Sequence, residues 1–182
     1  MSLQRKKLSS RIVYKNPWIK IHEDTTITPS GNKGIYGYLE SRDSCMIVAV
    51  NEKQQIFLVY SYRYPSKSYG WELPGGGGDN QDLLTASKRE LEEETGIIAN
   101  NWEVLGSAYV CNGFMTEKMA VYLASDLSFA GKKEDSDETF EDMRFFSREK
   151  ISKMIQNGDI NDCQTLAGLQ YYVTWLQNKD TN

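Results

Sequence analysis

The chain has 182 residues, of which 40% are hydrophobic and 25% are charged, and its formal net charge is −4 at pH 7. This length and composition are typical of one globular domain, with or without an extension. The acidic balance provides no general basic field for nucleic acid, and the longest purely apolar run, residues 45–50, is far too short to cross a bilayer. We therefore expect neither a nucleic-acid partner nor a membrane partner.

The basic residues 5–7 are not followed by an apolar segment, so no secretory signal is expected at the start of the chain. The three cysteines, Cys45, Cys111 and Cys163, are odd in number and widely spaced. This usage predicts reduced, buried thiols in a cytoplasmic protein, and neither a disulfide framework nor a zinc site. His22 is the single histidine, and we expect it to be a surface or structural residue.

The first half of the chain has the pattern of short strands separated by turn signals. Strands are predicted at residues 11–14, 19–28, 34–39, 45–50, 56–62 and 71–73. The continuously apolar segment 45–50 is typical of a buried central strand. The strand at 71–73 leads into the glycine-rich segment 75–78, which is predicted to be a loop.

A helix is predicted over residues 81–95, with Asn80 or Asp82 as its N-cap and Gly96 as its C-cap. Its inward stripe is formed by Leu83, Leu84, Ala86 and Leu91. The pattern then predicts strands at residues 102–110, 118–124 and 143–146, with an acidic stretch at 133–142 before the last of them.

Two helices are predicted at the end of the chain. Ser147 caps the first of them, and Asn157 and Gly158 end it. The second covers residues 162–177 and is amphipathic. Its predicted apolar face consists of Leu166, Leu169, Tyr172, Val173 and Leu176. Strands on both sides of a central helix, followed by these helices, predict an α/β fold in which a mixed sheet lies between helices.

Three glutamates crowd one face of the central helix near its end. Glu90 and Glu94 are four residues apart and Glu90 and Glu93 are three apart, so their side chains are neighbours. Like charges at this spacing weaken a helix, which suggests that a cation lies between them. Oxygen-only ligands favour Mg²⁺ or Mn²⁺. The alternative is an ordinary solvated acidic face.

The spacing around these glutamates resembles the signature of the Nudix hydrolases. That signature is glycine, five residues, glutamate, seven residues, Arg-Glu-apolar, one residue, Glu-Glu, one residue, Gly-apolar. Here it begins at Gly75, continues through Arg89-Glu90-Leu91 and ends at Gly96-Ile97. Every specified position matches except Gln81, which stands where the family has its first glutamate. We expect this substitution to tune loop geometry or rate and to leave metal binding intact.

The resemblance implies an α/β/α Nudix fold with an N-terminal antiparallel β-sheet extension. Residues 1–40 would form the extension, as part of the same unit and as a possible element of a homodimer. Residues 41–182 would form the Nudix domain. Trp18 and Tyr36 could pack across a partner or stack on a base, and core packing is the alternative.

Two runs are similar to the ADP-ribose and nucleotide-sugar pyrophosphatase branch of this family. They are Tyr-Arg-Tyr-Pro at residues 62–65 and Trp-Glu-Leu-Pro-Gly at residues 71–75. The resemblance implies that Arg63 and Glu72 bind substrate, and the planar fork of Arg63 suits phosphate oxygens. The proline that this branch commonly carries after its signature is missing from residues 111–114, so another nucleoside diphosphate sugar is an open alternative to ADP-ribose.

The expected reaction is hydrolysis of a pyrophosphate bond to a nucleoside monophosphate and a sugar phosphate. Glu90, Glu93 and Glu94 are the expected metal ligands, and the resemblance adds the Gly75 carbonyl. Arg89 would orient the cluster, and Glu93 is also a catalytic candidate. The resemblance takes the general base from the acidic loop, where Glu138 and Glu141 are candidates. The alternatives are a hydrolase of nucleoside triphosphates or dinucleoside polyphosphates, and a non-catalytic metabolite sensor, which the Gln81 departure favours.

Overall fold

A computed structural model describes residues 4–78, 81–131 and 140–179 of the chain. These residues divide into two compact units. The first unit combines Met1–Arg42 with Tyr109–Lys118, and the second combines Asp43–Ala108 with Met119–Asn182.

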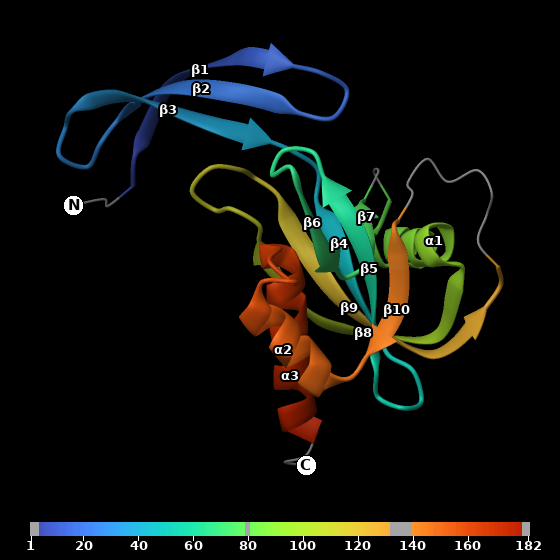
Figure 1. The fold of residues 1–182 in the computed structure, drawn as a ribbon. Coiled ribbons are helices and arrows are strands. Elements are labelled where there is room, and N and C mark those ends of the chain that lie inside the picture. The colour runs from blue at the N-terminus through green and yellow to red at the C-terminus, as the bar shows by residue number, and fades with distance from the viewer. Residues whose placement is uncertain (1–3, 79–80, 132–139, 180–182) are drawn as a thin grey trace. The chain divides into compact units, whose positions relative to one another are not determined.

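The first unit is built on an antiparallel three-stranded sheet in the order β1-β2-β3 (Figure 1). Its strands are β1 (Lys6–Lys15), β2 (Lys20–Ile27) and β3 (Lys33–Glu40). This arrangement confirms the N-terminal antiparallel sheet expected from the sequence. Strand β1 is exposed along its whole length within the chain.

His22 has a structural role in this sheet. Its Nε2 lies 2.6 Å from Glu40 Oε2, and its ring stacks on Tyr38 with 4.9 Å between ring centroids. Lys20 Nζ donates to the other oxygen of Glu40 at 2.5 Å. The hydrogen bonds from Lys20 and His22 lower the pKa of Glu40. The prediction of a surface or structural histidine agrees with this position.

Within the residues that the structure describes, the second unit contains two sheets and three helices. Its strands are β4 (Ser44–Ala49), β5 (Ile56–Arg63), β6 (Ser68–Glu72), β7 (Gly75–Gly77), β8 (Ile97–Tyr109), β9 (Lys118–Phe129) and β10 (Asp142–Phe146). The last residue of β8, Tyr109, and the first residue of β9, Lys118, belong to the first unit. Its helices are α1 (Leu83–Thr95), α2 (Arg148–Asn157) and α3 (Cys163–Lys179).

Helices cover the strands of this unit from two sides, α1 on one side and α2 and α3 on the other (Figure 1). One sheet has the order β7-β4-β9-β8 and is mixed, because β4 runs parallel to β9 and antiparallel to β7. The other sheet has the order β10-β5-β6 and is antiparallel. The expected mixed sheet between helices is therefore confirmed.

The core of the unit lies where α1 packs on β4, β5 and β9. One buried cluster joins Leu91 of α1 to the strands and contains Ile47, Ala49, Phe57, Val59, Leu91, Ile97 and Ala124. A second cluster joins Ala86 to Cys45, Ala120 and Tyr122. The apolar side of α1 thus holds the helix against the sheet.

The glycine-rich segment differs from the predicted loop, because Gly75–Gly77 forms strand β7 antiparallel to β4. A Cβ atom on Gly75 would lie 2.1 Å from the carbonyl oxygen of Cys45. The absence of a side chain therefore permits close pairing that a local turn pattern does not reveal. Helix α1 begins two residues later than predicted, after Asp82, whose side chain accepts a hydrogen bond from the Thr85 amide at 2.9 Å.

Two other predictions are wrong in part. Cys45 is buried as expected, but Cys111 and Cys163 are exposed, and all three are free thiols. On α3 the buried residues are Thr165, Gly168, Leu169 and Tyr172, whereas Val173 is exposed. Small residues occupy part of the contact face, so hydrophobicity alone misplaced it. In the part of the chain that the structure describes, no helix is long and apolar enough to span a membrane.

Candidate functional site

The last two turns of α1 bring three carboxylates to one region of the second unit. Glu94 is 5% exposed, and the side chains of Glu90 and Glu93 are 14% and 40% exposed. This end of a helix carries the negative pole of the helix dipole, which disfavours further negative charge. Burial of Glu90 and Glu94 adds a desolvation cost that positively charged or hydrogen-bonding partners must offset.

Arg89 supplies positive charge within the cluster. Its Nη2 lies 2.7 Å from Glu90 Oε1, and its Nη1 lies 2.9 Å from Glu93 Oε2. Nη2 also approaches the carbonyl oxygen of Gly77 at 3.5 Å. Burial opposes the charged form of Arg89, but the two carboxylates outweigh it and raise the pKa of the guanidinium. Arg89 therefore joins the helix to β7 and fixes two of the three glutamates.

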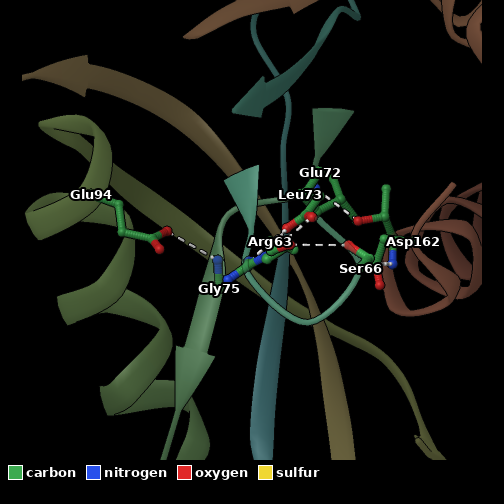
Figure 2. Close-up of polar contacts among 8 residues, drawn as sticks. Arg63, Ser66, Glu72, Leu73, Gly75, Glu94 and Asp162 are labelled. Atoms are coloured by element: carbon green, nitrogen blue, oxygen red, sulfur yellow. Dashed lines mark hydrogen bonds and ion pairs between the residues drawn. The ribbon is translucent and has the colours of Figure 1, made fainter. Parts of the chain in front are cut away.

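Strand β7 lies directly against the other side of the cluster. The backbone N–H of Gly75 donates to Glu94 Oε2 at 3.1 Å, and Figure 2 shows Glu94 extending from α1 toward Gly75. A Cβ atom on Gly76 would lie 2.6 Å from the carboxylate carbon of Glu90. Any side chain at this position would displace that carboxylate, so the position of Glu90 depends on a glycine at residue 76.

Cys45 of β4 supports the same strand. Its Sγ donates to the carbonyl oxygen of Gly76 at 3.5 Å. Burial raises the pKa of the Cys45 thiol, and the charges of Glu90 and Glu94 raise it further. The neutral thiol is therefore a packing and hydrogen-bonding group beside β7.

The cluster has the chemistry of a site for a hard divalent cation. Its donors are carboxylate oxygens, next to backbone carbonyls of a strand that closely approaches them. Among residues 4–78, 81–131 and 140–179, no group of three or more His, Cys, Asp or Glu side chains is already arranged to hold a metal ion. Glu90, Glu93 and Glu94 instead bind Arg89 and the Gly75 amide. The donor types fit a cation, and their rearrangement around it would complete the site.

Arg63 and Glu72 form an ion pair between the ends of β5 and β6 (Figure 2). Arg63 Nη2 lies 2.6 Å and Nε 3.0 Å from Glu72 Oε2. Glu72 is buried and Arg63 is exposed. The structure therefore brings together the two residues that the sequence assigns to substrate binding, with the buried carboxylate orienting the exposed guanidinium.

Of the two acidic-loop candidates, Glu138 lies outside the described residues. Glu141 precedes β10, and its backbone N–H donates to the carbonyl oxygen of Tyr60 at 3.0 Å. Its side chain accepts a hydrogen bond from the Tyr69 hydroxyl at 3.4 Å. The negative charge of Glu141 raises the pKa of Tyr69. Glu141 is thus tied to the β5–β6 hairpin that carries Arg63.

Sequence reasoning missed two residues that support the site. The sequence predicts Cys45 as a buried thiol at the start of a central strand and Thr165 as part of a helix, and it predicts neither of their contacts near the site. The Thr165 hydroxyl accepts the Leu73 amide, two residues before Gly75. A buried threonine on an otherwise apolar helix face is a signal of such a bond, but its partner is 92 positions away.

Comparisons with known proteins match both parts of the chain to family models. The NUDIX domain model matches residues 40–165, more than two thirds of the chain. The model of the nucleoside diphosphate sugar hydrolase N-terminal domain matches residues 6–39.

Two relatives and one solved structure align with most of the chain. An ADP-ribose pyrophosphatase of Mycobacterium tuberculosis is 29% identical over 89% of this chain and 80% of its own. An ADP-ribose pyrophosphatase of Bacillus subtilis is 25% identical over 93% of each chain. A crystal structure described as an ADP compounds hydrolase shares the fold, with a TM-score of 0.87, 21% identity and 98% coverage of both chains. The chain therefore belongs to the Nudix hydrolase family.

Proposed function

We propose that this protein is a divalent-metal-dependent hydrolase that cleaves the pyrophosphate bond of ADP-ribose or another nucleoside diphosphate sugar. The products would be a nucleoside monophosphate and a sugar phosphate. The observation that carries the proposal is the set of carboxylates Glu90, Glu93 and Glu94 packed against the glycine strand β7. The two ADP-ribose pyrophosphatases among its relatives support this choice of substrate class.

Glu90, Glu93 and Glu94 would hold the metal, together with the carbonyl of Gly75. Mg²⁺ or Mn²⁺ is the expected ion, because both favour oxygen ligands. When bound, such an ion neutralises pyrophosphate oxygens and lowers the pKa of bound water. Arg89 contacts both Glu90 and Glu93, so it would hold these two carboxylates in place as the site fills. Its further contact with Gly77 would keep β7 beside them.

Arg63 would contact a phosphate of the substrate. Its side chain is exposed at the end of β5, and its planar guanidinium can donate to two phosphate oxygens at once. Glu72 would restrict the directions in which that guanidinium can point. Because the buried Glu72 carboxylate and Arg63 form an ion pair, loss of either residue would disturb the other.

Proton removal from the attacking water is assigned to a carboxylate, with Glu93, Glu138 and Glu141 as the candidates. Glu93 is the most exposed member of the helical cluster and is held by Arg89. Glu141 accepts a hydrogen bond from the Tyr69 hydroxyl, which would orient its carboxylate. Comparison of Glu93→Gln, Glu138→Gln and Glu141→Gln would identify the base as the variant whose rate loses its acidic pH dependence.

A homodimer is part of the proposal. Strand β1 is exposed over its whole length, and several large apolar side chains lie on it, including Ile12, Val13 and Tyr14. An exposed edge strand with apolar side chains is a typical place for a partner to bind. A second copy of this chain is the expected partner, and a cytoplasmic location is the expected setting. Sedimentation of the purified protein would measure its oligomeric state.

A substrate panel tests the proposal. ADP-ribose, other nucleoside diphosphate sugars, nucleoside triphosphates and dinucleoside polyphosphates are incubated with Mg²⁺ or Mn²⁺, and phosphate is measured after phosphatase treatment. We expect the highest turnover with a diphosphate sugar. Turnover of triphosphates or dinucleoside polyphosphates alone would support those reactions instead. The absence of turnover with every compound, combined with tight binding of one, would identify a sensor.

A further inference from the structure

Strand β6 forms one side of the β10-β5-β6 sheet and leads directly to the glycine strand. Two backbone amides near the end of this strand donate hydrogen bonds to the segment that follows α2 and to the first turn of α3. The Trp71 N–H donates to the carbonyl oxygen of Asp159 at 2.9 Å. The Leu73 N–H, just after the strand, donates to Thr165 Oγ1 at 3.1 Å. The C-terminal helices thus complete the hydrogen bonding of the strand that carries Glu72.

Thr165 is held firmly in the first turn of α3. It is fully buried, and its own N–H donates to Asp162 Oδ2 at 2.7 Å. Asp162 also accepts the Leu166 amide through its carbonyl oxygen, so it begins the helix. Figure 2 shows Asp162 together with Leu73 and Glu72. The Thr165 hydroxyl, which accepts the hydrogen bond from the Leu73 amide, is therefore held in place by the first turn of the helix.

Side-chain packing reinforces this contact. A Cβ atom on Gly168 would lie 2.6 Å from Leu73 Cδ1, so Leu73 packs directly on the backbone of α3 one turn after Thr165. Leu73 is buried. The residue is thus held by its amide and by its side chain, and its backbone has little freedom to shift.

Leu73 stands between two contacts of the candidate site. The preceding residue, Glu72, holds Arg63. Two residues later, the Gly75 amide holds Glu94. A displacement of the Leu73 backbone would therefore move the phosphate-binding arginine and the carboxylate helix relative to each other.

We propose that Thr165 is a positioning residue for the reaction, which fixes the Leu73 backbone and through it the Arg63–Glu72 pair and the Gly75 amide. The inference rests on the proposed hydrolysis of a diphosphate sugar. It assigns to the C-terminal helix a role in substrate alignment as well as in packing.

The test compares Thr165→Val, which keeps the shape and removes the hydroxyl, with Thr165→Ser, which keeps the hydroxyl. Thr174→Val is the matched control, because Thr174 is an exposed threonine of the same helix whose hydroxyl bonds with Gln170 one turn earlier. We expect Thr165→Val to raise KM for the preferred diphosphate sugar about tenfold, with a smaller change in kcat. Thr165→Ser and Thr174→Val should stay within about twofold of wild type.

Hydrogen exchange at the Leu73 amide gives a readout that does not depend on activity. It should accelerate in Thr165→Val and stay slow in the other two variants. If Thr165→Val does not fold, Thr165→Ala is measured against Thr165→Ser in the same way. If wild type is active and the Thr165→Val or Thr165→Ala variant has the same KM and kcat, the positioning role is overturned. Inactivity of wild type on every diphosphate sugar would instead refute the proposed function.

Discussion

Replacement of Glu94 by glutamine separates its charge from its shape. The amide oxygen of the introduced glutamine would still accept the Gly75 N–H that the carboxylate accepts at 3.1 Å. The Glu94→Gln variant therefore keeps the contact between α1 and β7 and loses one negative charge from a site that is 5% exposed. Because that charge lies at the negative end of a helix, its loss should relieve about 0.3–1 kcal/mol of unfavourable electrostatic energy in metal-free protein.

In the presence of metal, the Glu94→Gln variant should instead be less stabilised than wild type. An ion at about 100 times its Kd stabilises the folded state by about 2.7 kcal/mol, which corresponds to a rise in Tm of roughly 5–11 °C for a domain of this size. We expect wild type to show this rise with Mg²⁺ and the Glu94→Gln variant to lose most of it. The rate of diphosphate-sugar hydrolysis should fall by about 10²–10³, as when one electrostatic contact to the transition state is removed.

The assay is a thermal melt of each protein in excess EDTA and in excess Mg²⁺. Glu92→Gln is the matched control, since it removes the same charge from the same helix at a residue that is not an expected ligand. The reasoning would be refuted if Glu94→Gln kept the full Mg²⁺ shift. It would also be refuted if Glu92→Gln lost the shift to the same extent.

Three further predictions concern the surroundings of this cluster. Gln81→Glu should change kcat by less than about tenfold and leave the Mg²⁺-dependent Tm shift unaltered; an increase of many orders of magnitude would show that the family glutamate is essential here. Gly76→Ala should fold but lose activity by at least about tenfold, because its Cβ would lie 2.6 Å from the Glu90 carboxylate carbon; wild-type kcat/KM would contradict the packing argument. Burial raises the pKa of Cys45 above its ordinary 9.0, so above that pH the unfolded thiol loses its proton while the folded thiol keeps it. Folding stability should therefore fall as the pH rises, and urea unfolding at pH 8 and pH 10 should show a smaller fall for Cys45→Ala than for wild type.

Local patterns in the sequence were sufficient to predict most elements of the fold. The apolar run at residues 45–50 predicted β4, and the capping residues Asp82 and Gly96 predicted α1 to within two residues. These features depend on residues that are close in the sequence, so local sequence patterns are sufficient to predict them. Helical spacing alone also predicts that Glu90, Glu93 and Glu94 are neighbours, whereas their assignment as metal ligands rests on the resemblance to the Nudix signature.

The features that the sequence did not reveal depend on contacts between distant segments. Strand β7 exists because glycine lets the chain approach Cys45, a partner about 30 positions earlier. The buried face of α3 includes Thr165 and Gly168 because each meets Leu73, one through a hydroxyl and the other through its missing side chain. The periodicity of hydrophobic residues predicts neither the hydrogen bond of Thr165 nor the close packing at Gly168. The ion pair of Arg63 with Glu72 likewise joins residues that strand pairing does not place opposite each other, since Arg63 lies opposite Ser68 and Glu72 lies opposite Val59.

Identification of the products formed by the purified protein tests the central claim most directly. ADP-ribose and other nucleoside diphosphate sugars are incubated with Mg²⁺ or with excess EDTA, and the products are measured by mass spectrometry. We predict a nucleoside monophosphate and a sugar phosphate in equal amounts with Mg²⁺, and intact substrate with EDTA. Release of a nucleoside diphosphate and free sugar, or equal turnover in EDTA, would contradict the account.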